Sequence, residues 1–403
     1  MYKIIFISAL FLILIAACTN LSNTPEFLTR KGGNSYCNID LDMNNIASIP
    51  IDSLVRDVKF IRLETSKECM ISSYDKILVL KDTIYILDKT QLKAVFAFDM
   101  QGRFLYKISA LGRGPGEYVR AYDFYVDTVD SHIGILDYGK VQKYNFKGEH
   151  IGQVSFSGNV LAYFCYYSGK YNGACLDKFT KDKSYIFAQY DSIGNLIYRD
   201  HPTSNDMLKS ELGKSNYFTS NSEGGYFNDF GADTIYRITN SFLEPAFVLD
   251  YGNSALPLNT RNELITKDFD EKYSYFKQNQ NTVRFGLRSM SISENYLLLE
   301  LPYGNSLKTV LFSLNTHAVK FLDNYINYHH SILRCLNGSF SGEYVVGNIG
   351  AAYISSLNQW NYDDLKITKR EIEHPFFYQN IDDYKDIKET DNGIICIFSF
   401  DEF

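Results

Sequence analysis

The chain lacks the short motifs that identify many enzyme and cofactor classes. It has no H-E-x-x-H and no G-x-S-x-G, so metalloprotease and α/β-hydrolase functions have no motif to support them. Its seven cysteines include no C-x-x-C pair, the usual ligand spacing of zinc and thioredoxin-like centres. A Ser/His/Asp triad can assemble from distant positions, so these absences weaken an enzymatic function without excluding it.

Other shortages bound the class of protein. Lys and Arg are not clustered and the formal net charge is −7, which argues against a nucleic-acid-binding footprint. Eight prolines are too few for a mucin-like or disordered chain. Trp360 is the single tryptophan, whereas 32 tyrosines and 29 phenylalanines favour β-sheet. After residue 17 no segment is apolar enough to cross a bilayer.

The amino terminus has the layout of a bacterial secretory signal. A basic residue, Lys3, precedes an apolar run over 4–15, and small residues lead to Cys18. This pattern resembles a lipobox, which would make Cys18 the lipid-modified first residue of the mature chain. The alternative is an ordinary signal peptide that is cut nearby.

We therefore predict three segments: a lipoprotein signal peptide over 1–17, a polar tether over 18–35 and a folded domain over 36–403. Thr19 follows the modified cysteine, and no acidic run comes directly after it. Both features favour an outer-membrane lipoprotein on the periplasmic face rather than at the cell surface.

A short pattern of an aromatic residue, a turn residue and an apolar stretch recurs at a constant step of 46 residues. The four copies are FDMQGRFL (98–105), YNFKGEHI (144–151), YDSIGNLI (190–197) and YRITNSFL (236–243). An aromatic residue followed by a residue that tolerates positive φ and a second apolar stretch is typical of a β-hairpin. Hairpins at this spacing predict the blades of a β-propeller.

The repeats predict six four-stranded antiparallel blades. The step breaks after the fourth copy, and the charged segment near 258–281 has the apolar spacing of a helix, so we predict a small helical insertion there. The strand-like VKFIRLET (58–65) lies upstream of the first blade. We predict that this amino-terminal strand closes the last blade, because a closed ring leaves no unpaired edge.

The sequence LET at 63–65 and the segment LGRGPGEY at 111–118 resemble a known group. They are similar to the six-bladed β-propeller lipoproteins of Bacteroidetes, which are related in shape to NHL and TolB-type propellers. The resemblance extends over about 36–400 and departs from the usual pattern at Gly393, where proline is commoner. It implies a fold and an envelope location, and it carries over no catalytic residue.

The heptapeptide GRGPGEY (112–118) lies on the predicted crossover from the first blade to the second. Its glycine N–H groups could hold an anion, and we name as candidate ligand contacts Arg113, Glu117, Tyr118 and Arg120. The alternative is that three glycines and a proline build a compact loop without any ligand.

Metal and disulfide sites have weaker signals. Paired acids near turns could bind Ca²⁺ through oxygen ligands, although such acids more often cap turns; they are Asp123 and Asp127, Asp177 and Asp182, and Asp229 and Asp233. His329 and His330 would point to opposite faces of a strand. Cys165 and Cys175 flank a turn, so they could form a disulfide or remain buried thiols.

The function we expect is that of a lipid-anchored binding or scaffolding module in the cell envelope. Its ligand at the propeller channel mouth would be a glycan, a peptide or a protein partner, without nucleic acid and without a cofactor. The competing class is a propeller hydrolase or lactonase that uses a divalent cation, such as Ca²⁺, in the channel. We expect a non-catalytic protein, because no catalytic motif is present.

Overall fold

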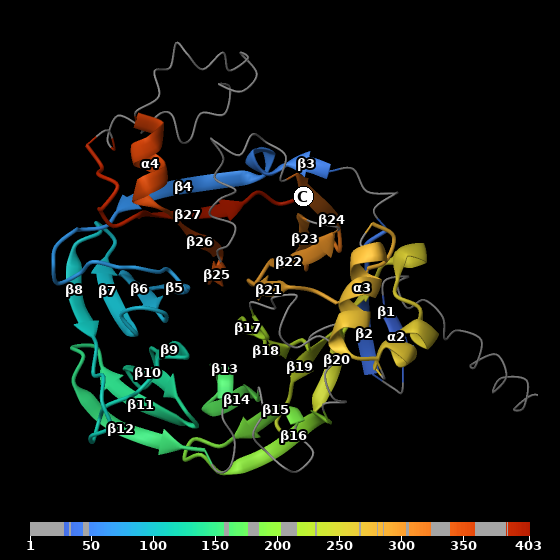
Figure 1. The fold of residues 1–403 in the computed structure, drawn as a ribbon, viewed down its shortest axis with the longest axis horizontal. Coiled ribbons are helices and arrows are strands. Elements are labelled where there is room, and N and C mark those ends of the chain that lie inside the picture. Colours follow the sequence, from blue (N-terminus) through green and yellow to red (C-terminus); the bar gives the residue numbers. More distant parts are fainter. Residues whose placement is uncertain are drawn as a thin grey trace, which may run out of the picture.

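The computed structural model shows a ring of six β-sheets around a central axis (Figure 1). It describes residues 28–31, 34–42, 48–156, 161–175, 185–202, 216–229, 232–265, 267–279, 281–284, 286–303, 306–323, 339–358, 384 and 386–403. The predicted signal peptide, Cys18, Asp177, Asp182, the two adjacent histidines and Trp360 lie outside these residues. Among the described helices, none combines the length and the hydropathy that crossing a membrane requires.

The first three blades follow the repeat closely. Blade one contains β5 (Lys76–Leu80), β6 (Thr83–Asp88), β7 (Ala94–Asp99) and β8 (Phe104–Ile108). Blade two contains β9 (Asp123–Asp127), β10 (His132–Asp137), β11 (Lys140–Asn145) and β12 (His150–Ser155). Blade three contains β13 (Leu161–Tyr167), β14 (Lys170–Cys175), β15 (Tyr185–Tyr190) and β16 (Leu196–Pro202).

Blades four and five have the same antiparallel meander. Blade four contains β17 (Phe218–Ser220), β18 (Gly225–Phe227), β19 (Thr234–Ile238) and β20 (Leu243–Asp250). Blade five contains β21 (Ser289–Ile292), β22 (Tyr296–Tyr303), β23 (Ser306–Ser313) and β24 (Val319–Asp323). In each blade the first strand lies nearest the axis (Figure 1).

Blade six is closed by the amino-terminal strand, as predicted. It contains β25 (Ser339–Ser341), β26 (Tyr344–Ile349), β27 (Ile394–Phe400) and β4 (Val55–Arg62). β4 pairs antiparallel with β27 from Ile394↔Arg62 to Phe400↔Val55. A Cβ atom at Gly393 would lie 2.5 Å from the Ile349 carbonyl oxygen, which accounts for glycine at the start of this strand.

The segment that precedes β4 adds strands outside the six blades, of which only the strand over 36–41 was indicated by the sequence. β2 (Asn34–Asp40) pairs parallel with β20, and β3 (Ser48–Pro50) pairs parallel with β24. β1 (Leu28–Lys31), within the predicted tether, pairs with β2. The amino-terminal segment therefore runs outside blades four, five and six in turn, and the sheets of blades four and five have six and five strands.

The repeated hairpins hold neighbouring blades together. Their turn glycines Gly102, Gly148 and Gly194 all have positive φ. A Cβ atom at Gly102 would lie 1.9 Å from the Arg62 carbonyl oxygen in blade six, and one at Gly194 would lie 2.1 Å from the Ser155 carbonyl oxygen in blade two. The repeat thus marks the places where the outer hairpin of one blade touches the outer strand of the preceding blade.

Hydroxyl groups join the inner strands around the axis. Each accepts an N–H donated by the inner strand of the next blade: Thr219 from Ile292 (2.9 Å), Ser291 from Phe340 (2.6 Å) and Ser341 from Val79 (2.9 Å). An inner strand has one unpaired edge, so these bonds satisfy backbone donors that face no strand.

The insertion after blade four is helical, as predicted, and consists of two helices. α2 (Leu258–Ile265) and α3 (Phe269–Asn279) lie beside blade four, and their apolar contacts centre on Leu264 and Phe276 (Figure 1). A third helix, α4 (Ala351–Asn358), follows β26.

Cys165 is a free cysteine. In the register of the β13–β14 hairpin, Cys165 lies opposite Asn172 and Cys175 lies opposite Leu161, so the disulfide alternative is wrong.

Candidate functional site

The heptapeptide GRGPGEY is on the crossover from β8 to β9, as predicted, but it lies between the outer halves of blades one and two. Tyr118 is fully buried there. Its hydroxyl donates to the Lys93 carbonyl oxygen at 2.8 Å and to the Ile108 carbonyl oxygen at 3.1 Å, both in blade one. The Tyr118 side chain therefore fastens the crossover to the blade that precedes it.

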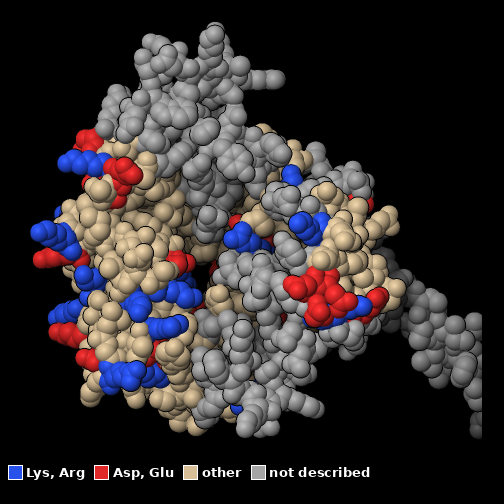
Figure 2. Space-filling view, viewed as in Figure 1, with Lys and Arg blue, Asp and Glu red and all other residues tan. Residues whose placement is uncertain are grey.

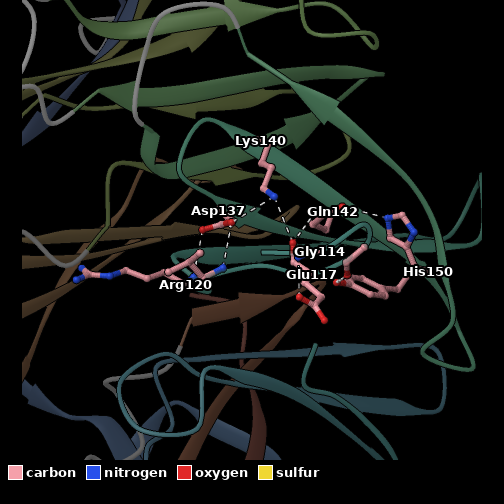
Figure 3. A network of polar contacts seen from close by, with 10 residues as sticks. Gly114, Glu117, Arg120, Asp137, Lys140, Gln142 and His150 are labelled. Carbon is pink, nitrogen blue, oxygen red and sulfur yellow. Dashed lines mark hydrogen bonds and ion pairs between the residues drawn. The ribbon is translucent and has the colours of Figure 1, made fainter. Parts of the chain in front are cut away.

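The other side of the loop is held by blade two (Figure 3). Lys140 and Gln142 donate to the Glu117 carbonyl oxygen at 3.2 and 2.7 Å. Tyr144 donates to the Gly116 carbonyl oxygen at 2.7 Å. All three donors belong to β11, a strand away from the axis, so the heptapeptide is not at the channel mouth.

The contacts within the loop explain why glycine occurs at two of its positions. Gly116 has φ +76°, and a Cβ atom on it would lie 2.8 Å from the His150 ring. The Gly114 N–H donates to the Glu117 carboxylate at 2.7 Å. The Glu117 carboxylate thus accepts an N–H group that the sequence analysis had offered to an external anion.

The two arginines are more accessible, and both are exposed. Within the described residues Arg113 forms no ion pair, so the Arg113–Glu117 bridge that a purely structural loop could use is not present. The Arg120 N–H and the Val119 N–H each donate to the buried Asp137 carboxylate at 3.1 Å. The Arg120 guanidinium lies 5.9 Å from the Tyr122 ring centroid and 5.7 Å from that of Tyr138.

These contacts give the loop a test. Glu117→Ala is expected to lower the free energy of unfolding by ~1–2 kcal/mol, because the Gly114 N–H loses its acceptor. Arg113→Ala is the matched control and should leave the melting temperature unchanged. If both variants instead lost ligand binding while keeping the wild-type melting temperature, the heptapeptide would be the ligand site.

The channel mouth is formed by the beginnings of the inner strands, and its described part is held together across blades one to three. Lys76, the first residue of β5, donates to the Asp123 carboxylate at 2.8 Å and to the Phe124 carbonyl oxygen at 2.8 Å. The other oxygen of Asp123 accepts the Phe164 N–H at 3.3 Å. An ion pair with a partly buried carboxylate thus fixes three inner strands at one end of the channel.

A lysine and two tyrosines lie beside this ion pair. The Lys89 ammonium, from the β6–β7 turn of blade one, is 5.0 Å from the Tyr163 ring centroid in blade three. The Tyr163 and Tyr217 ring centroids are 5.1 Å apart. Burial, and then the charge of Asp123, raise the pKa of Tyr163, so its hydroxyl stays protonated and able to donate. Tyr163 is half-buried: its ring packs against the apolar cluster between blades three and four and also contacts the Lys89 ammonium.

The thiol at this end is not a nucleophile. Cys165 follows Phe164 on β13, and burial raises the pKa of its thiol to about 11. Since the thiolate is the reactive form, the thiol is inert at neutral pH.

One residue of the predicted acid pairs, Asp233, has a structural role. Its carboxylate accepts the Gly286 backbone N–H at 2.7 Å.

Within the described residues, a group of three possible metal ligands lies away from this mouth. Asp127, Asp130 and His132 gather at the β9–β10 turn, at the opposite end of β9 from Asp123. The His132 Nε2 atom is 2.8 Å from the Tyr125 hydroxyl. Burial and the nearby Lys143 lower the pKa of His132, so the ring is neutral at pH 7. Asp123, by contrast, is an ion-pair partner of Lys76.

Sequence reasoning identified neither Lys89 nor Tyr163. Both belong to short segments without a motif, and they meet only because blades one and three converge on the same mouth. Nothing in the sequence distinguishes either residue from many other surface residues.

Comparison with known proteins supports the fold. A family model described as "Domain of unknown function (DUF4934)" matches residues 36–399. The crystal structure of a protein from Bacteroides fragilis, described as exported, is 17% identical, has a TM-score of 0.70 and covers 91% of this chain and 99% of its own. At that identity the likeness shows the fold alone. No curated protein matches the chain.

Two other solved structures are more distant. The extracellular domain of a hybrid two-component system from B. thetaiotaomicron is 11% identical, with a TM-score of 0.36 and coverage of 65% of this chain and 29% of its own. BamB from Moraxella catarrhalis is 7% identical, with a TM-score of 0.31 and coverage of 81% and 70%. Neither likeness carries an argument about function.

Proposed function

We propose that this chain, which belongs to the family described as Domain of unknown function (DUF4934), is a lipid-anchored binding module of the cell envelope. Its ligand lies at the channel mouth formed by blades one to three. The observation that carries this proposal is the half-buried Tyr163 with the Lys89 ammonium over its ring, beside inner strands fixed by the Lys76–Asp123 pair. Rigid strands that present a few converging polar and aromatic groups are typical of ligand sites.

The envelope location rests on the sequence of the amino terminus. Residues 1–17 act as a lipoprotein signal, and Cys18 carries the lipid on the periplasmic face of the outer membrane. The description of the B. fragilis structure as an exported protein agrees with export. The resemblance to the NHL and TolB-like propeller lipoproteins belongs to the same proposal.

The anchor has a direct test. Cys18→Ser is expected to move the protein from the membrane pellet to the soluble periplasmic fraction, because a polar tether makes no other membrane contact. Fractionation at high salt, followed by immunoblotting, measures this shift. A variant that still pellets with membranes would contradict acylation at Cys18.

The binding function is tested by ligand-induced stabilisation. We expect at least one probe from a panel of neutral and acidic oligosaccharides and short peptides to raise the melting temperature of the wild-type chain. The rise should disappear in Tyr163→Ala, which removes the aromatic surface at the mouth. It should persist in the control Tyr344→Ala, which removes an exposed tyrosine at the other end of the inner strands.

Two results would overturn the binding proposal. One is that no probe stabilises the wild-type protein, and the other is that the stabilisation survives in Tyr163→Ala. The competing proposal, a hydrolase or lactonase with a divalent cation in the channel, has weaker support from the described residues. The carboxylate at the mouth, Asp123, already pairs with Lys76, and the nearby thiol is protonated.

A further inference from the structure

The β6–β7 turn holds Lys89 in a fixed place. Asp88 is fully buried. Its carboxylate accepts N–H groups from the β4–β5 connection, at Ser72 and Ser73, and from the β6–β7 turn, at Gln91 and Leu92. The Lys89 N–H itself donates to the Asp75 carboxylate at 2.8 Å. These hydrogen bonds fix the backbone of the turn, from which the Lys89 side chain reaches the Tyr163 ring of blade three.

The charge on Lys89 is not neutralised within the described residues. No described carboxylate lies within ion-pair distance of its ammonium, which rests over the Tyr163 ring instead. Asp75 and Asp88 are nearby, but their carboxylates accept backbone N–H groups of the β4–β5 connection and of the β6–β7 turn. Lys76 differs, since Asp123 pairs with it. The mouth therefore offers one cation that is held in place and has no counter-ion among these residues.

The distribution of charge over the same face is uneven. Figure 2 shows acidic side chains gathered over the helical insertion, whereas basic and acidic side chains alternate along blades one and two. The acidic residues of that insertion include Glu263, Asp270 and Glu271. An anion would therefore be repelled from the side of the insertion.

Two tyrosines form an aromatic wall beside the Lys89 ammonium. The Tyr163 and Tyr217 ring centroids are 5.1 Å apart, and the Tyr163 hydroxyl is protonated and able to donate. An aromatic ring with a hydroxyl donor at its edge suits a sugar ring, which has an apolar face and many hydroxyl acceptors.

Resting on the proposed binding function, we infer that the ligand at the channel mouth is a carboxylated oligosaccharide. Its carboxylate pairs with the Lys89 ammonium, and a sugar ring lies against Tyr163. Charge-assisted hydrogen bonds of this kind are stronger than neutral ones, which sets the discrimination against an uncharged sugar.

The test compares an acid with its own neutral form. Isothermal titration compares trigalacturonic acid with its methyl ester, which keeps the sugar rings and removes the carboxylate charges. We expect the wild-type chain to bind the acid at least about tenfold more tightly than the ester. Lys89→Gln should reduce the affinity for the acid to that for the ester. The control Lys81→Gln, an exposed lysine in the β5–β6 turn at the other end of the channel, should bind like the wild type. Added salt should weaken binding of the acid only.

The outcomes separate the inference from the proposed function. Equal affinity for acid and ester, lost in Tyr163→Ala, would overturn the carboxylate inference and leave the binding module intact. Binding of a pentaglutamate peptide but of neither sugar form would show that the oligosaccharide class is wrong. Failure of both sugar forms to bind also overturns the inference, while the wider probe panel decides separately whether the mouth binds any ligand.

Discussion

A chain that lacks residues 19–65 is expected to lose its cooperative thermal transition. The deletion removes β4, and β27, in which every residue is buried, then has no partner on its outer side. Each buried backbone group without a partner costs ~1–3 kcal/mol, and a domain has a total stability of about 5–15 kcal/mol. Several lost pairs therefore exceed what the ring can tolerate.

A shorter deletion provides the control. A chain that lacks residues 19–33 keeps β2, β3 and β4, and it should melt cooperatively. Circular dichroism and differential scanning calorimetry measure both transitions. If the longer deletion melted like the wild type, the ring would have to close by a strand other than β4.

The second large effect is expected at a repeat glycine. Gly194→Ala should destabilise the protein by at least ~3 kcal/mol, because it combines positive φ with a Cβ atom 2.1 Å from the Ser155 carbonyl oxygen. Gly169→Ala is the matched control, since Gly169 has φ +73° and no atom within 4 Å of its added Cβ. That variant should lose only ~1–2 kcal/mol from backbone strain.

Urea denaturation of the two variants measures the difference between them. The excess in Gly194→Ala reports the contact between blades two and three. Equal losses in the two variants would show that backbone strain alone explains the repeat glycine, and that the hairpins do not hold neighbouring blades in contact.

The architecture was largely predictable because its signal is local and repeated. Phe98, Tyr144, Tyr190 and Tyr236 all lie next to a register shift in the outer hairpin of their blade, so the same sequence pattern meets the same geometry four times. The closing strand could also be predicted, because a strand upstream of the first blade can pair only with the open edge of the last blade if the ring is to close.

The remaining features depend on contacts that no local pattern records. The parallel pairing of β2 and β3 follows from the path of the amino-terminal segment around the ring. A helical insertion over 258–281 was predicted, but its division into α2 and α3 was not, because no proline or glycine marks the boundary between them. The glycines and proline of the heptapeptide indicated a compact loop. The position of this loop, however, depends on contacts with Lys93, Gln142 and Tyr144, which belong to two different blades.

The candidate site was predictable only as a location. A channel mouth follows from any propeller, whereas Lys89 over Tyr163 requires the lengths of two side chains and the spacing of non-adjacent blades. The sequence suggested a ligand contact at Arg113, Glu117, Tyr118 and Arg120, because a glycine-rich turn does not require charged or aromatic side chains. The structure shows that Tyr118 and Glu117 do hold the loop, through hydrogen bonds.

Hydrogen–deuterium exchange, with and without the probe that stabilises the wild-type chain most, tests the location of the ligand most directly. We predict slower exchange at the channel mouth, in the β6–β7 turn over 89–93 and in β13, with no change in the heptapeptide at 112–118. Protection confined to 112–118, with the turn and β13 unchanged, would contradict a ligand site at the channel mouth.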